Sequence, residues 1–136
     1  MKRGQFFGIP NLIQGFKTMA QHFFIRGLNG RKIDVEFTKK GVFHWNGIKF
    51  IAHHPIVQLD EDTIGQNPFI WTVSVYKQGC NIIKKEYPTR IFKNIKSAKE
   101  AAITVLNNRG IKAINKQLNQ YPIINIPDVK MPPKHE

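Results

Sequence analysis

The sequence predicts an α+β domain: an antiparallel sheet of three to five strands packed on one C-terminal helix, with an N-terminal amphipathic helix before the sheet. Three features lead to this prediction. Apolar residues first recur at helical spacing, they then alternate with polar residues at a period of two, and a capped apolar helix follows the last predicted strand. The 136 residues suffice for one domain with a buried core, and a hydrophobic content of 41% excludes a disordered polycation.

Residues 1–31 contain the predicted N-terminal helix. Apolar side chains recur at helical spacing from Ile9 to Phe23 and Phe24, and Pro10 suits a first helical turn. The segment is basic and has no acidic residue, which is typical of a mitochondrial presequence. The same pattern also fits a helix packed on the domain core. Both interpretations stay open, and they are compatible if the segment is retained.

Residues 32–119 are predicted to form the folded domain, and its first strands have clear signals. Residues 33–38 alternate between apolar and polar side chains, which predicts a half-buried strand. Residues 42–45 and 48–52 are joined by Asn46-Gly47. This dipeptide favours the positive φ angles of a two-residue turn, so the segment is predicted to be a hairpin.

The second half of the sheet is predicted from weaker signals. Residues 53–68 are expected to form a long loop that contains the acidic cluster Asp60-Glu61-Asp62. A strand is predicted over residues 69–76, followed by a turn. A returning strand is predicted over residues 82–92, where Pro88 indicates an edge strand or a bulge.

The helix that follows is the best-specified element. Ser97-Ala98-Lys99-Glu100 matches a capping box, in which Ser97 accepts a backbone hydrogen bond and Glu100 reaches back to the cap. Arg109 lies in the last turn and Gly110 is the predicted stop. Residues 120–136 are predicted to be an extended, proline-rich tail on the surface. The apolar stripe of the helix consists of Ala98, Ala101, Ala102, Val105 and Leu106.

The charge of the chain indicates a polyanionic partner. The formal net charge is +12, and between residues 63 and 127 only Glu86 and Glu100 oppose ten Lys and Arg residues. Such an excess destabilises the compact state by self-repulsion unless a polyanion neutralises it. Nucleic acid is the favoured partner, while an anionic membrane surface and a role in solubility alone are the alternatives. No apolar run approaches the roughly 20 residues that span a bilayer.

Catalytic and metal-binding patterns are nearly absent from the sequence. Cys80 is the single cysteine and has no evident His partner, so neither a disulfide within the chain nor a cysteine nucleophile is expected. His53 and His54 are neighbours on a predicted strand and would point to opposite faces, which disfavours a shared metal ion. We therefore expect no catalytic residue, no metal and no cofactor, and we predict that the protein is not an enzyme.

Binding residues are predicted where bases and aromatic side chains alternate, in the last two strands and at the start of the helix. Bases of this kind contact phosphates, and aromatic rings contact sugars or bases. Trp71 and Phe92 lie in the same region but are favoured as core residues. The predicted nucleic-acid-binding residues are Lys77, Lys84, Lys85, Arg90, Lys93, Lys96, Lys99, Tyr76 and Tyr87.

Residues 41–115 resemble the APETALA-type, ethylene-response-factor-like DNA-binding domain, including its apicomplexan branch. The resemblance rests on Trp71 with the alternating Val73 and Val75, on residues 90–102, and on Arg109-Gly110 beyond the helix. It implies a three-stranded antiparallel sheet packed on one helix. The sequence between Trp45 and Trp71 is longer than in the family, and the first-strand arginines that read bases in the family are missing, with His44 in their neighbourhood.

These departures suggest a module reused for structured RNA. The resulting hypothesis is a non-enzymatic RNA-binding protein of mitochondrial ribosomal type, part of a large ribonucleoprotein assembly, with RNA favoured over DNA. Residues 98–102 also resemble the last helix of double-stranded-RNA-binding domains, and phage integrase arm-binding domains share the order of sheet and helix. A DNA-binding transcription factor or mobile-element protein is the first alternative. A scaffold subunit that places its basic face on an acidic protein or a membrane is the second.

Overall fold

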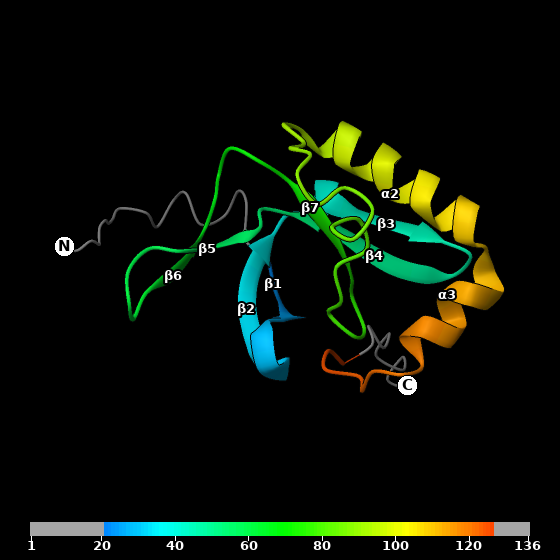
Figure 1. The fold of residues 1–136 in the computed structure, drawn as a ribbon, viewed down its shortest axis with the longest axis horizontal. Coiled ribbons are helices and arrows are strands. Elements are labelled where there is room, and N and C mark those ends of the chain that lie inside the picture. The colour runs from blue at the N-terminus through cyan, green and yellow to red at the C-terminus, as the bar shows by residue number, and fades with distance from the viewer. Residues whose placement is uncertain (1–20, 127–136) are drawn as a thin grey trace, which may run out of the picture.

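The computed structural model describes residues 21–126, which form small antiparallel sheets followed by helices (Figure 1). The α+β class is therefore confirmed. The strands do not join into one continuous sheet, because they divide into one sheet of three strands and two sheets of two strands. Residues 1–20 and 127–136, which include most of the predicted N-terminal helix and of the tail, lie outside the described residues.

The central sheet has the strand order β3-β4-β7 and contains β3 (Val42–Trp45), β4 (Ile48–His53) and β7 (Thr72–Val75). All its pairs are antiparallel. The predicted hairpin is confirmed: Trp45 pairs with Ile48, and φ is 49° at Asn46 and 79° at Gly47. These values are the positive φ angles that the Asn-Gly dipeptide accommodates at low steric cost.

A second hairpin forms from β1 (Gln21–Arg26) and β2 (Lys32–Phe37), connected through the 3₁₀ turn η1 (Leu28–Gly30). The half-buried strand predicted over residues 33–38 is thus confirmed. The predicted N-terminal helix is wrong for residues 21–26, since Phe23 and Ile25 are buried while Phe24 between them is exposed. This period of two belongs to a strand, and the strand pairs with β2.

The two faces of the central sheet are covered by different elements. Phe50, Ala52, Val73 and Val75 pack with the helix α2 in one core cluster. On the other face, Ile51 packs with the inner residues of the β1–β2 hairpin in a second cluster. Figure 1 shows α2 and the β1–β2 hairpin on different sides of the sheet. The domain therefore has three layers, with the central sheet in the middle.

Residues 53–68, predicted as a loop, contain a third hairpin. It consists of β5 (Ile56–Gln58) and β6 (Ile64–Gln66) and extends away from the helices in Figure 1. Each strand has three residues, which is too short for an alternation signal to be read from sequence. The acidic cluster Asp60-Glu61-Asp62 occupies the turn, as the loop prediction placed it.

The predicted returning strand over residues 82–92 is wrong. Only isolated bridges form there, between Ser74 and Asn81 and between Trp71 and Phe92. Between them the chain forms an irregular connection that we call the arch, residues 81–92. Two consecutive side chains, Ile82 and Ile83, are both buried at its start, which a strand with one buried face cannot achieve.

The helix α2 (Ile95–Arg109) is capped differently from the prediction. Asn94 has extended dihedral angles and its Oδ1 accepts the backbone N–H of Ser97 at 2.8 Å. The N-cap is therefore Asn94, and the predicted capping box at Ser97 is wrong by one turn. Asn is as effective an N-cap as Ser, so the sequence allowed both starts. The predicted apolar stripe is confirmed, because all five of its residues are buried.

A second helix, α3 (Ile111–Leu118), follows directly and corrects the prediction of a single C-terminal helix. Gly110 ends α2 as predicted, with φ at 85° and its N–H bonded to the Leu106 carbonyl. Ile114 and Leu118 are buried four residues apart, on one face of α3. Within residues 21–126 neither helix has the length and apolarity that crossing a membrane requires.

Residues 121–126 form neither a helix nor a strand. Asn125 is buried and attaches this segment to the sheet: its side chain accepts the Phe24 N–H at 2.8 Å and donates to the carbonyls of Phe24 and Tyr76. The backbone N–H groups of Ile124 and Asn125 bond to the Lys77 carbonyl. The tail thereby connects β1 to the turn after β7.

Candidate nucleic-acid interface

The structure divides the predicted binding residues into three groups. Four of them lie in the arch, three lie just before or within the first turns of α2, and two lie at the end of β7. The arch and the start of α2 are continuous in the chain and form one candidate interface. Its members are Lys84, Lys85, Tyr87 and Arg90 of the arch, followed by Lys93, Lys96 and Lys99.

The arch is held by its own hydrogen bonds, which position its basic side chains. Asn81 Oδ1 accepts the N–H groups of Ile83 and Lys84 at 3.0 and 2.7 Å. The Tyr87 N–H donates to the Ile83 carbonyl at 2.9 Å. These bonds form a local turn of the kind that Asn side chains support. Lys84 therefore projects from a fixed backbone.

Arg90 lies against aromatic rings at the far end of the arch. Its guanidinium carbon is 4.9 Å from the centroid of Phe92 and 5.4 Å from that of Tyr87. The two rings meet edge to face with centroids 5.7 Å apart. Cation–π contacts of this type hold an arginine in place while leaving its N–H groups available. Phe92 is buried, as expected, whereas Tyr87 is half-buried.

The acidic residue of the arch is neutralised from the helix. Arg109 Nη2 donates to both carboxylate oxygens of Glu86, at 2.9 and 2.6 Å. Lys84, Lys85, Lys93 and Lys96 are exposed, and none of them forms an ion pair within residues 21–126. The net positive charge of the arch is therefore presented to solvent.

Beside the arch is a cavity of about 420 Å³, which we call the arch hollow. Trp71, Tyr87 and Phe92 supply aromatic wall, and Arg26, Lys84 and Arg90 supply positive charge. No carboxylate lines it. Arg26 is not among the predicted binding residues, because residues 1–31 are predicted as the N-terminal helical segment. Phe23, Phe24 and Ile25 are consecutive apolar residues and provide no alternation that would indicate a strand.

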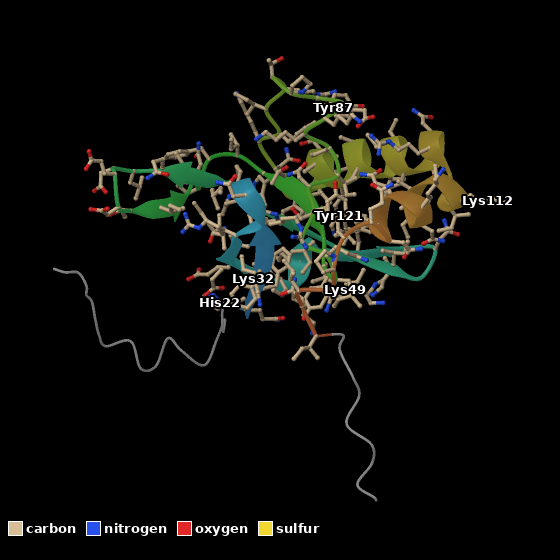
Figure 2. The ribbon with its side chains drawn as sticks, turned by 60° about the horizontal axis from the view of Figure 1, so that its bottom comes forward. His22, Lys32, Lys49, Tyr87, Lys112 and Tyr121 are labelled. Carbon is tan, nitrogen blue, oxygen red and sulfur yellow. The ribbon has the colours of Figure 1, made fainter. Side chains whose placement is uncertain are left out.

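Tyr76 and Lys77 belong to a different surface. They line a second cavity of about 320 Å³ together with His44, Lys49 and Gln78. Tyr76 is engaged internally, because it stacks on Phe23 with centroids 5.8 Å apart and donates its hydroxyl to the Ile126 carbonyl at 3.1 Å. Figure 2 shows Lys49 and Tyr87 at opposite edges of the molecule. The structure thus does not bring Tyr76 and Lys77 together with the arch.

The middle of the central sheet is not open to a nucleic-acid backbone. On the face away from α2, Ile51 is 0% exposed and His53 and Ser74 are each 1% exposed. The β1–β2 hairpin covers this face through contacts such as Phe23 on His53, with ring centroids 5.4 Å apart. Of the predicted binding residues that are exposed bases, Lys77 follows β7, and the others lie on the arch and at the start of α2: Lys84, Lys85, Arg90, Lys93 and Lys96.

His53 and His54 point to different environments, as their neighbouring positions predicted. His53 Nδ1 donates to the His54 carbonyl at 2.9 Å, so Nε2 accepts from the Ser74 hydroxyl at 2.9 Å. Burial lowers the pKa of His53 to about 4. His54 instead donates to the Ile70 carbonyl and stacks on Trp71 with centroids 3.9 Å apart. Among residues 21–126, no three His, Cys, Asp or Glu side chains are grouped as metal ligands.

Cys80 also lies near the arch hollow. It is half-buried, and burial raises the pKa of its thiol, while nearby Arg26 acts in the opposite direction. A raised pKa keeps the sulfur in the weakly nucleophilic thiol form. The surroundings of Cys80 thus favour a structural role.

Comparison with known proteins adds no assignment: no family model, no curated protein and no solved structure matches the chain. The resemblance to the APETALA-type domain therefore stays a prediction.

Proposed function

We propose that the protein is a non-enzymatic RNA-binding protein that contacts phosphates with the arch and the start of α2. The observation that supports this most is the unbalanced charge of that surface. Lys84, Lys85, Lys93 and Lys96 are exposed and Lys99 is half-buried, while the carboxylate of Glu86 is already bound by Arg109. Lysine and arginine side chains on one surface provide the sequence-independent affinity for a phosphate backbone.

The start of α2 supports the same proposal. Its first turn contains no acidic residue, whereas Lys93 and Lys96 lie just before and within it. Cations near a helix N-terminus are unfavourable because that end of the helix dipole is positive. An incoming phosphate relieves this repulsion, because an anion is favoured at the positive end of a helix dipole. The arrangement is therefore better suited to an anionic partner than to the isolated protein.

RNA is favoured over double-stranded DNA by shape. The β1–β2 hairpin covers the middle of the central sheet, so that face offers no flat surface for a groove. The candidate interface is an irregular loop and a helix start. Such surfaces suit structured or single-stranded RNA, which is recognised by shape and backbone. A mitochondrial ribosomal setting and descent from an APETALA-like module remain part of the proposal. A sequence-specific DNA-binding protein is the alternative.

Exposed apolar residues favour membership in a larger assembly. Val57, Leu59 and Ile64 of the β5–β6 hairpin are 37%, 62% and 38% exposed. Two-stranded hairpins are marginally stable alone, and apolar groups on them are commonly covered by a partner. This observation supports a ribonucleoprotein subunit, and it equally supports the second candidate, a scaffold subunit of a protein complex.

The salt dependence of RNA affinity tests the proposal. Lys84, Lys85, Arg90 and Lys93 are changed together to Gln in the full chain, and affinity for structured RNA is measured over a range of salt concentrations. If each group neutralises one phosphate, the slope of log K against log salt becomes shallower by about 3. The same measurement on duplex DNA of random and selected sequences tests the DNA alternative, which predicts one preferred sequence.

A control variant with the same loss of charge distinguishes the effect of this surface on RNA affinity from the effect of the net charge of the protein. Lys39, Lys40, Lys112 and Lys116 are also exposed and lie in the turn η2 (Lys39–Gly41) and in α3. Changing these four to Gln removes the same charge from other surfaces, so the slope is expected to change far less. Equal slopes for the two quadruple variants, or no change in either, would contradict the proposed interface.

A further inference from the structure

The arch hollow differs from a core cavity in its lining. Ile91 is 57% exposed at its edge, and Lys84 and Arg90 are exposed as well. The inner wall is aromatic, from Trp71 and Tyr87. A surface cavity with an apolar interior and charged edges is typical of a site for a ligand that has an apolar part and an anionic part.

We propose that the arch hollow binds one unpaired nucleotide of the RNA, with its base inside and its phosphate at Lys84 and Arg90. This inference rests on the proposed function and adds the kind of RNA that is recognised. A volume of about 420 Å³ is within the range of roughly 300–1,000 Å³ that small-ligand sites have. One nucleotide fills such a space, while a paired base in a helix cannot enter it.

The aromatic rings that line the arch hollow are suited to bind the base of the nucleotide. Single-stranded nucleic acids bind proteins by stacking bases on aromatic rings and on arginine guanidinium planes. The edge-to-face packing of Tyr87 on Phe92 and the contact of Arg90 with both rings build one such surface. Trp71 contributes beside it, with His54 stacked on it. These side chains are held by one another before any ligand arrives.

The basic residues that line the arch hollow are suited to bind the phosphate of the nucleotide. Arg26, Lys84 and Arg90 line the hollow without a carboxylate, so an anion entering it meets attraction only. Arg26 is also incompletely satisfied. Its Nη2 donates to the Pro122 carbonyl at 3.1 Å, but its buried Nε has no hydrogen-bond partner among the described residues. A phosphate oxygen of the bound nucleotide, or a water molecule bound to it, would accept the hydrogen bond that the Arg26 Nε–H lacks in the free protein.

The consequence is a preference for unpaired RNA. A base in a duplex is stacked and paired, and moving it into the hollow costs the energy of unstacking. A single strand or a loop enters without that cost. Phosphate contacts at Lys84, Lys85 and Lys93 bind either form, so the hollow alone discriminates between them.

The test compares oligouridylate of about ten nucleotides, within the site sizes of single-strand binders, with an RNA duplex of similar length. The variant Tyr87→Leu removes the ring and keeps an apolar side chain. It is expected to weaken binding of oligouridylate on the order of tenfold, and to weaken duplex binding by a clearly smaller factor, because the lysines of the interface remain. Phe69→Leu is the matched control, because Phe69 is an aromatic residue that is 79% exposed and does not line the hollow.

A second measurement does not depend on the stability of the Tyr87 variant. The chain has two tryptophans, so Trp45→Phe leaves Trp71 as the single fluorescent reporter. Oligouridylate is expected to quench the fluorescence of Trp71 in proportion to the fraction of protein bound, which the anisotropy of labelled RNA measures. The duplex is expected to leave the fluorescence of Trp71 unchanged. Unchanged Trp71 emission at saturation, or equal loss of both RNA forms in Tyr87→Leu, would overturn the inference. The quadruple Gln variant distinguishes the two proposals. If that variant loses binding of both oligouridylate and the duplex, the proposed phosphate interface is supported even where the results on Tyr87→Leu and Trp71 contradict the nucleotide site.

Discussion

The stability of the fold is predicted to depend on the neutral form of His53. The imidazole is 1% exposed between the central sheet and the β1–β2 hairpin. Its Nε2 accepts from the Ser74 hydroxyl and its Nδ1 donates to the His54 carbonyl. Protonation adds a hydrogen on Nε2, which removes that acceptor and places a charge in an apolar layer. Burial is the main cause that lowers the pKa of His53 from 6.5 to about 4.

The sign and size of the effect follow from linkage. Between pH 4 and 6.5 the unfolded chain binds more protons at His53 than the folded chain, so the stability contributed by this group rises with pH in that range. It is fully present above about pH 6.5 and is lost as the pH falls toward 4. The loss amounts to about 2 kcal/mol at pH 5 and about 3 kcal/mol at pH 4.

Urea unfolding at a series of pH values measures this loss, and His53→Gln is the comparison. Gln keeps polar atoms but does not titrate, so its free energy of unfolding should lack the His53 contribution to the pH dependence. The difference between the two curves isolates His53 from the carboxylates that titrate below pH 5. Parallel curves for the two proteins from pH 7 to 4 would refute the reasoning, since they would mean that His53 titrates alike in both states.

Two further predictions concern elements that position the interface. Asn94→Ala removes the N-cap of α2 and should lower the free energy of unfolding by about 1 kcal/mol. Ser97→Ala should lower it by less. If denaturant unfolding shows a larger loss for Ser97→Ala, the capping box predicted at Ser97 is correct after all. Asn125→Ala leaves the Phe24 N–H and two carbonyls without their partner and should cost about 2 kcal/mol. Hydrogen exchange at Phe24 should then accelerate, and unchanged exchange would mean that the tail does not secure β1.

The elements that were predictable are those with a strong local signal. Asn46-Gly47 specified its hairpin because few dipeptides accept two positive φ angles. The alanine-rich stripe specified α2 because its period is helical over several turns. The prediction is wrong at residues 21–26, where the consecutive apolar residues Phe23, Phe24 and Ile25 fit a helix as well as a strand. It also lacks α3, whose eight residues provide only two buried positions.

The sequence predicts which residues belong to the candidate site, but it does not predict how they are arranged in space. Clustering of Lys84, Lys85, Arg90 and Lys93 was visible along the chain, and the structure places them on one loop and a helix start. That Tyr76 and Lys77 lie on another surface depends on the tertiary position of the β1–β2 hairpin. The pairing of Glu86 with Arg109, which are 23 residues apart, likewise depends on the packing of α2. Contacts at such separation leave no periodic signal in the sequence.

The central claim is that phosphates contact the arch and the start of α2. Ultraviolet crosslinking of the full chain to RNA, followed by mass spectrometry of the crosslinked peptides, locates the contact directly. The account predicts that nucleotide adducts concentrate on residues 81–99, with Tyr87 or a lysine beside it as the attachment point. Adducts confined to the β5–β6 hairpin or to α3, with residues 81–99 unmodified, would contradict it.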